Sequence, residues 1–214
     1  VDETFGGGAK QINAWSKTAL NSFGLSTLQA KQFTGYLGAM MKSSGITGNS
    51  LIKMSENLSG LAGDIASFDN LPIEDAFEKI RSGISGETEP LKQLGINMDV
   101  TNLSHYALAK GIKTSWNEMS QAQQTMLRYQ YLMSVTKDKQ GDFTRTQNTF
   151  ANQVRLAKVN LQQLGASIGT YALPPLNKIL NAFNNGGMKS IGTVVGGAFA
   201  SIANVAKSLS KPMQ

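Results

Sequence analysis

Hydrophobic and polar residues along this chain recur with the spacing of α-helices. In residues 49–68 the apolar side chains follow one another at steps of three and four, which forms a single stripe on a helix: Leu51, Met54, Leu58, Leu61, Ile65 and Phe68. No segment alternates between apolar and polar residues for long enough to indicate a strand. The sequence therefore predicts an all-α chain, a bundle of short amphipathic helices followed by a long heptad-patterned helix, with no sheet.

Helix start signals divide the first part of the chain. Ser26 and Gln29 form a capping-box sequence, which predicts a helix from there to about residue 45. Ser120 begins a similar sequence and a longer helix. Helices are also expected over residues 9–23 and, as short pieces, over residues 101–110. Residues 1–8 contain three consecutive glycines and are expected to be a flexible lead, so that the bundle comprises residues 9–140.

The segment LPIEDAFEKIRSGISGETEPLKQLGINM, residues 71–98, combines clustered carboxylates with glycines and prolines. Proline is tolerated in the first turn of a helix, so Pro72 is expected to start one. Its predicted buried face consists of Ile73, Phe77 and Ile80. Gly83 and Gly86 are expected to bound a turn before a second short helix that ends at residue 95.

The most regular pattern follows residue 141. Nine residues are spaced four, three, four, three without interruption, and eight of them are apolar: Phe143, Gln147, Phe150, Val154, Ala157, Leu161, Leu164, Ile168 and Tyr171. Such a heptad seam either packs along other helices of the same chain or associates with copies of itself as a coiled coil, in which Gln147 would set the register. A long helix is expected over residues 141–185, with a kink at Pro174 and Pro175.

A Gly/Ala-rich apolar segment occupies residues 186–214. Seventeen uncharged residues separate Lys189 from Lys207, fewer than the about 20 apolar residues of a membrane span. Gly192 and Gly196 have the small-residue spacing that allows helices to approach closely in lipid. Ordinary close packing of helices explains the same spacing, so membrane insertion and close packing are both compatible with this segment.

Charge is distributed unevenly along the chain. Residues 1–105 carry eight Lys or Arg and eleven Asp or Glu, whereas residues 106–214 carry twelve and three. Seven cations and no anion follow Asp142. This half should favour an acidic protein surface, a phosphate backbone or an anionic membrane, although a solvated helix face gives the same composition.

Candidate chemistry is sparse. The chain has no cysteine and one histidine, His105, which excludes thiolate metal sites and disulfides and leaves no partner for a histidine zinc site. Glu74, Asp75 and Glu78 lie close together on one predicted helix, whereas acid–base catalysis needs carboxyl groups facing each other across a substrate. No nucleotide-binding or nucleophile motif occurs. We therefore expect neither an enzyme nor a bound cofactor or metal.

Two blocks of the sequence belong together: ASFDNLPIEDAFEKIRSGISGETEPLKQLGINM, residues 66–98, and LRYQYLMSVTKDKQGDFTRTQNTFANQVRLAKVNLQQLGASIGTYALPPLNKIL, residues 127–180. In combination they resemble the conserved N-terminal region of phage tail tape measure proteins. With the helices between and just before them, the resemblance covers about residues 51–183. Residues 1–30 and the segment after residue 185 do not contribute to it. A tape measure sets tail length by its own length, so this chain is expected to be one portion of a longer protein.

The resemblance implies a structural and assembly function in a bacteriophage tail. The protein would fill the tail tube lumen in several copies, set the tail length and leave ahead of the DNA at ejection. The implied partners are other copies of the chain, the tail tube protein, tail tip proteins and tail assembly chaperones, with no specific nucleic-acid sequence. The implied locations are the virion tail and the host cytoplasm during assembly. The alternative is that a segment around residues 191–206 inserts into the host membrane and assists the passage of DNA into the host.

Overall fold

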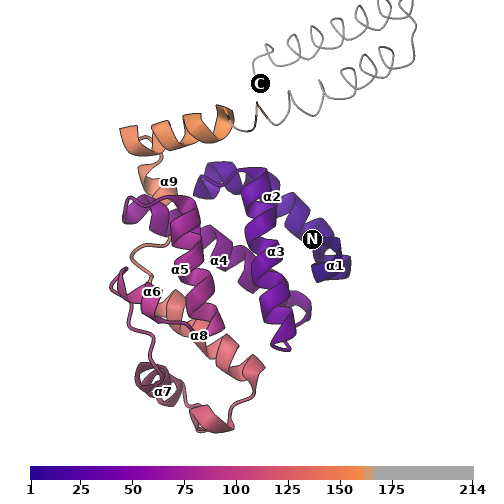
Figure 1. Ribbon diagram of the computed structural model, residues 1–214, viewed down its shortest axis with the longest axis vertical. Helices are drawn as coiled ribbons and strands as arrows, with labels where there is room; N and C mark the ends of the chain where they lie inside the picture. The colour runs from indigo at the N-terminus through magenta and orange to yellow at the C-terminus, as the bar shows by residue number, and fades with distance from the viewer. Residues whose placement is uncertain (162, 164, 166–214) are drawn as a thin grey trace, which may run out of the picture. The chain divides into compact units, whose positions relative to one another are not determined.

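The computed structural model describes residues 1–161, 163 and 165, and these residues form helices, turns and loops without a strand (Figure 1). The all-α prediction is confirmed for this part of the chain. The chain divides into two units, Val1–Leu156 and Ala157–Gln214. The helices of the first unit are, in order, α1 (Asp2–Phe5), the 3-10 helix η1 (Gly6–Gly8), α2 (Ala9–Phe23), α3 (Thr27–Ser43), α4 (Gly48–Phe68), α5 (Ile73–Ser85), α6 (Glu89–Lys92), α7 (Val100–Ala109), the 3-10 helix η2 (Trp116–Glu118), α8 (Gln121–Val135) and α9 (Asp142–Thr146). Residues 150–161 are again helical.

Helix α4 is the centre of the first unit, and α2, α3, α5 and α9 pack against it (Figure 1). The predicted apolar stripe of α4 is buried from Leu51 to Ile65, whereas Phe68 at its end is half-exposed. Two glycines allow α2 to approach α4 closely. A Cβ added to Gly63 would lie 2.1 Å from the backbone oxygen of Phe23, and one added to Gly60 would lie 2.9 Å from the ring of Phe23. The close contact between α2 and α4 therefore requires glycine at these positions.

The predicted helix starts are confirmed where capping residues mark them. Ser26 and Gln29 form a reciprocal capping box at α3, with backbone-to-side-chain distances of 2.9 and 3.0 Å. Ser120 and Gln123 form another at α8. Residues 9–23 form α2 with the predicted bounds, and the short pieces expected over residues 101–110 are one helix, α7. These signals succeed because a cap satisfies orphan backbone groups locally, whatever the tertiary fold.

The predicted buried face of α5 is also confirmed. Ile73, Phe77 and Ile80 are all at most 4% exposed. The ring of Phe77 stacks on that of Phe33 from α3, with a centroid distance of 3.8 Å and an interplanar angle of 5°. The predicted turn after Gly83 is wrong, because α5 continues to Ser85. Gly83 therefore lies inside the helix. Its lack of a side chain leaves room for Leu91, whose side chain would lie 2.3 Å from an added Cβ.

Residues 1–8 differ from the expected flexible lead. Residues 2–5 form α1, and the three glycines form η1. Phe5 is 9% exposed and packs on Gly38 of α3, where its ring would lie 2.3 Å from an added Cβ. The Phe5 side chain fills the space that Gly38 leaves on α3, and this contact attaches the N-terminal segment to the bundle. The run of three glycines gave no indication of this attachment.

Helices α7 and α8 pack against each other, and α8 also packs against α5. Tyr106 of α7 meets Tyr131 of α8 edge to face, with ring centroids 5.5 Å apart. The hydroxyl of Tyr131 donates to the backbone oxygen of Asn97 at 2.8 Å. Arg128 lies 5.1 Å from the ring of Trp116 in η2. These contacts attach the segment 97–119 to α8.

Candidate functional site

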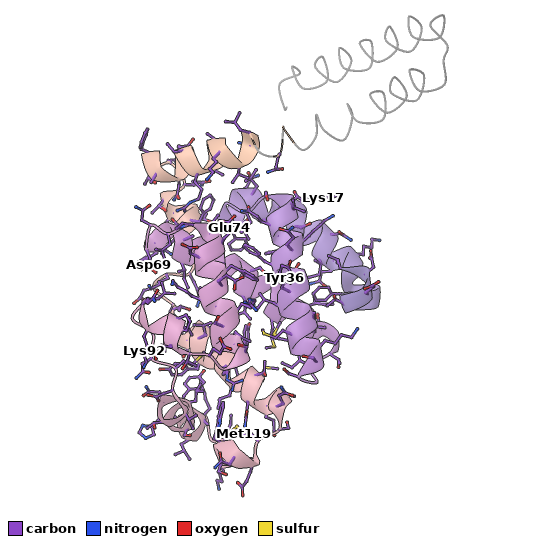
Figure 2. All side chains as sticks on the ribbon, in the orientation of Figure 1. Lys17, Tyr36, Asp69, Glu74, Lys92 and Met119 are labelled. Carbon is purple, nitrogen blue, oxygen red and sulfur yellow. The ribbon has the colours of Figure 1, made fainter. Side chains whose placement is uncertain are left out.

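The carboxylates of α5 lie on its outer surface. Glu74, Asp75 and Glu78 are all exposed, and Figure 2 labels Glu74 on this helix. Glu78 forms an ion pair with Arg81 at 2.6 Å, and Glu74 accepts a hydrogen bond from Gln29 at 2.6 Å. No cavity that we describe is lined by these three residues. They form the solvated side of the helix whose other side packs into the core.

His105 lies on the exposed side of α7. Over the part of the chain that the structure describes, no group of three or more His, Cys, Asp or Glu side chains is arranged to hold a metal ion. His105 therefore has no set of neighbouring ligands within the described residues.

The predicted heptad seam is divided by the structure. Phe143 is in α9 and is fully buried, with its ring 2.6 Å from where a Cβ on Gly24 would lie. Residues 147–149, which include Gln147, are not helical, so Phe143 and Phe150 are on separate helices. Phe150 is 85% exposed, Val154 51% and Leu161 69%, and Ala157 is also exposed. The last three predicted positions, Leu164, Ile168 and Tyr171, lie outside the described residues, as do Gly192 and Gly196.

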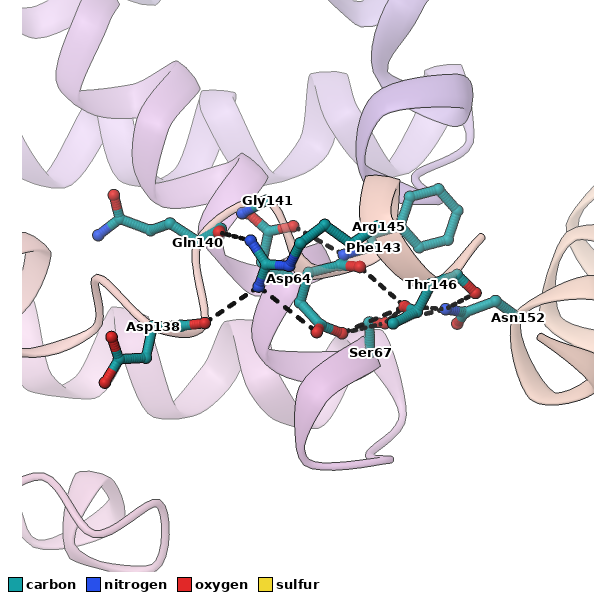
Figure 3. Close-up of polar contacts among 10 residues, drawn as sticks. Asp64, Ser67, Asp138, Gln140, Gly141, Phe143, Arg145, Thr146 and Asn152 are labelled. Atoms are coloured by element: carbon teal, nitrogen blue, oxygen red, sulfur yellow. Dashed lines mark hydrogen bonds and ion pairs between the residues drawn. The ribbon is translucent and has the colours of Figure 1, made fainter. Parts of the chain in front are cut away.

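The densest polar cluster of the described chain was not predicted. We call it the Asp64 network; it consists of Asp64 and Ser67 of α4, Asp142 and Thr146 of α9, and Asn152 (Figure 3). Asp64, Asp142 and Asn152 are 3%, 8% and 3% exposed. The network joins α4 to α9 and to the helix that begins at residue 150.

Asp64 holds the start of α9. Its two carboxylate oxygens accept hydrogen bonds from the backbone N–H of Gly141 at 2.8 Å and of Phe143 at 3.2 Å. Gly141 has a φ of 74°, in the left-handed region that favours glycine, and this turn directs its N–H towards Asp64. Asp64 thus satisfies two of the orphan N–H groups at the N-terminus of α9 from another helix.

Burial raises the pKa of Asp64 to about 6, and the two backbone hydrogen bonds act in the opposite direction. The neighbouring Asp142 raises this pKa further, whereas Arg145 lowers it. The Asp142 carboxylate lies 3.6 Å from the guanidinium of Arg145. Two buried carboxylates thus share one half-exposed cation.

Ser67, Thr146 and Asn152 complete the Asp64 network. The hydroxyl of Ser67 donates to Asp142 at 2.7 Å. The side-chain amide of Asn152 donates to the hydroxyls of Ser67 and Thr146, each at 2.9 Å (Figure 3). The side chain of Asn152 points towards α4, whereas Phe150, two residues earlier, faces solvent.

Arg155 extends this attachment by one helical turn. Its guanidinium donates to the backbone oxygens of Ala66 at 2.9 Å and Leu71 at 3.1 Å, and to the side chain of Asn152 at 2.9 Å. Burial lowers the pKa of Arg155. The two carbonyls belong to the C-terminal end of α4 and the following turn, where a cation is favourable.

The Asp64 network positions α9 and the helix that begins at residue 150 against α4. The carboxylates of Asp64 and Asp142 accept hydrogen bonds from backbone N–H groups and hydroxyls, and neither residue lines any of the cavities described. One sequence signal could have found Asp64, because it is the only charged residue in the stretch Leu58–Ala66. An acid in so apolar a stretch needs buried hydrogen-bond donors.

Within the part of the chain that the structure covers, no helix is both long enough and apolar enough to cross a membrane. Comparisons of the chain with protein-family models, with curated proteins and with solved structures found no match.

Proposed function

We propose that this chain is a portion of a bacteriophage tail tape measure protein, a structural and assembly component that fills the tail tube lumen, sets tail length and leaves at DNA ejection. The proposal rests on the resemblance of residues 66–98 and 127–180 to that family, together with the helical fold of the described residues. On this proposal the partners are further copies of the chain, the tail tube protein, tail tip proteins and assembly chaperones. Its locations are the tail of the virion and the host cytoplasm during assembly.

One structural observation carries the assembly role. Helical residues 150–161 present exposed apolar side chains at positions 150, 154, 157 and 161. At 100° per residue these four positions fall within about 60° of one another, on one side of the helix. Asn152 and Arg155 attach the same helix to the bundle through hydrogen bonds. An exposed stripe on an anchored helix is typical of a surface that another helix covers.

We infer that a second copy of the chain covers this stripe, through the heptad seam that continues in the sequence as Leu164, Ile168 and Tyr171. The seam residues from Phe150 onward carry no charge, which suits close contact between identical helices. The cations that follow Asp142 would face an electronegative tube lining.

Sedimentation of the full chain tests this proposal. We expect the wild-type chain to form oligomers at micromolar concentration, and Val154→Glu to sediment as a monomer, because a buried carboxylate in the seam is costly. Leu28→Glu is the matched control, since Leu28 is an exposed leucine of α3 outside the seam, and it should still associate. A wild-type chain that remains monomeric at high micromolar concentration would contradict the proposed self-association.

The alternative function is insertion of residues 191–206 into the host membrane, and it rests on the uncharged stretch between Lys189 and Lys207. Flotation with anionic liposomes separates the two functions. Loss of flotation on removal of residues 186–214 would favour membrane insertion, whereas a chain that fills the tube lumen need not float.

A further inference from the structure

Two adjoining cavities form a groove along α8, which we call the α8 groove. The first has a volume of about 460 Å³ and lies between the α3–α4 turn and the N-terminal half of α8. The second has a volume of about 650 Å³ and lies between the C-terminal end of α7 and the C-terminal half of α8. Both cavities are lined by Ile112 and Gln130, so they are neighbours along the helix.

The first cavity of the α8 groove is mainly apolar and contains two methionines, whereas the second is lined mainly by polar residues and adds Met133. Met119, Met126 and Met133 follow one another at steps of seven residues and line the groove from end to end, and Met119 lies next to η2 (Figure 2). Ile46 and Ile112 form its walls in the first cavity. Methionine side chains are flexible and polarisable, so they fit the irregular apolar face of a bound helix.

The charge along the α8 groove has one sign. The charged residues that line its second cavity are Lys110 and Lys137, and among the described residues no carboxylate lines either cavity. Both lysines are exposed, and neither forms an ion pair with any residue that the structure describes. Glu118, which precedes Met119, is instead held by Ser115, whose backbone N–H and hydroxyl donate to it at 3.1 and 2.7 Å.

We propose that the α8 groove binds an amphipathic helix of a partner protein whose apolar face is flanked by Asp and Glu. The apolar first cavity and Met133 would receive the apolar face, and Lys110 and Lys137 in the second cavity would pair with the flanking carboxylates. The segment from Ala122 to Lys137 spans about 23 Å at 1.5 Å per residue, so a partner helix of about 15 residues matches its length.

The charge pattern of the chain argues against its own segments as the occupant. No acidic residue follows Asp142, so the C-terminal residues would bring further cations to a groove lined by lysines. The acidic helix α5 of a second copy is unsuitable as well, because its apolar face is buried in its own bundle. The proposal is independent of the self-association proposed above, which uses a different helix.

Fluorescence polarisation with the full chain tests this proposal. The probe is a labelled helical peptide of about 15 residues, with leucine at one-face spacing and glutamate at the flanking positions. Its twin carries lysine in place of every glutamate. We expect saturable binding of the acidic peptide, weakened by salt, and no saturable binding of the basic twin.

A second experiment reverses the charge of the two lysines that line the α8 groove. The double variant Lys110→Glu with Lys137→Glu should weaken binding of the acidic peptide about tenfold and should bind the basic twin instead. The matched control is Lys10→Glu with Lys17→Glu, which changes two exposed lysines of α2 and the net charge equally. We expect this control to retain wild-type affinity.

Three results would overturn the proposal: absence of saturable binding of the acidic peptide, equal binding of both peptides, or equal loss of affinity in the groove and control variants. The comparison of the two peptides on the wild-type chain needs no substitution, so it remains decisive even if a variant fails to fold. Substitution of Met126 by Gln provides a further test, because it should lower affinity for the acidic peptide without changing the charge.

Discussion

The carboxylate of Asp64 accepts a hydrogen bond from the backbone N–H of Gly141, at 2.8 Å, across 77 residues of sequence. This contact connects the central helix α4 with the turn that precedes α9. Because Asp64 is 3% exposed, ionisation of its carboxyl group carries a desolvation cost. This cost can be measured.

The first prediction concerns the pH dependence of stability. The pKa of Asp64 is 3.8 in the unfolded reference and about 6 in the folded chain, so the folded state binds more protons between these values. The resulting stability is fully present below the lower pKa and is lost as pH rises through the higher one. We expect Asp64 to lower the free energy of unfolding by about 2 kcal/mol between pH 4 and pH 7.

Urea denaturation at a series of pH values measures this effect. Asp64→Asn removes the titrating group and should flatten the decline in the free energy of unfolding over this range. Asp75→Asn, which changes an exposed carboxylate of α5, is the control and should keep the wild-type profile. If Asp64→Asn kept the wild-type profile as well, the assigned pKa would be wrong.

The second prediction concerns the close contact between α2 and α4. Gly63→Ala should lower the free energy of unfolding by at least about 2 kcal/mol, because its Cβ would meet backbone rather than a movable side chain. Gly35→Ala is the matched control inside α3, where an added Cβ meets nothing within 4 Å. It should raise stability by about 0.5–1 kcal/mol. Equal effects of the two substitutions in chemical denaturation would contradict the helix packing.

The third prediction compares two phenylalanines of the predicted seam. Phe143→Ala should lower the free energy of unfolding by about 3–5 kcal/mol, because the ring is fully buried against Gly24. Phe150→Ala should change monomer stability by less than about 0.5 kcal/mol, because its ring is exposed. Denaturation at low protein concentration measures both. Similar losses for the two variants would mean that the break at residues 147–149 is wrong.

The helix that begins at residue 150 is attached to α4 through Asn152. Asn152→Ala removes hydrogen bonds to Ser67 and Thr146 and should cost about 1–3 kcal/mol. Amide hydrogen exchange should accelerate in residues 150–156 more than in α3, because the opening is local. Asn160→Ala, at an exposed position, is the control. Uniform acceleration across the chain would indicate global destabilisation and contradict a local attachment.

Local signals in the sequence determined most of the helices. The capping residues Ser26 and Ser120 and the stripe from Leu51 to Ile65 predicted their elements correctly, because caps and helical periodicity act between residues a few positions apart. The exposed carboxylates of α5 followed from the same periodicity, since Ile73, Phe77 and Ile80 occupy its other side.

What those helices contact depends on the tertiary structure. Phe143 and Phe150 occupy equivalent positions in the heptad spacing, yet the Phe143 ring packs against Gly24 and the Phe150 ring faces solvent. Asp64, the position of Gly83 inside α5 and the docking of Phe5 on Gly38 likewise depend on partners that are distant along the chain. A periodic pattern shows which residues share one side of a helix, but burial depends on the neighbouring element, which the pattern does not contain.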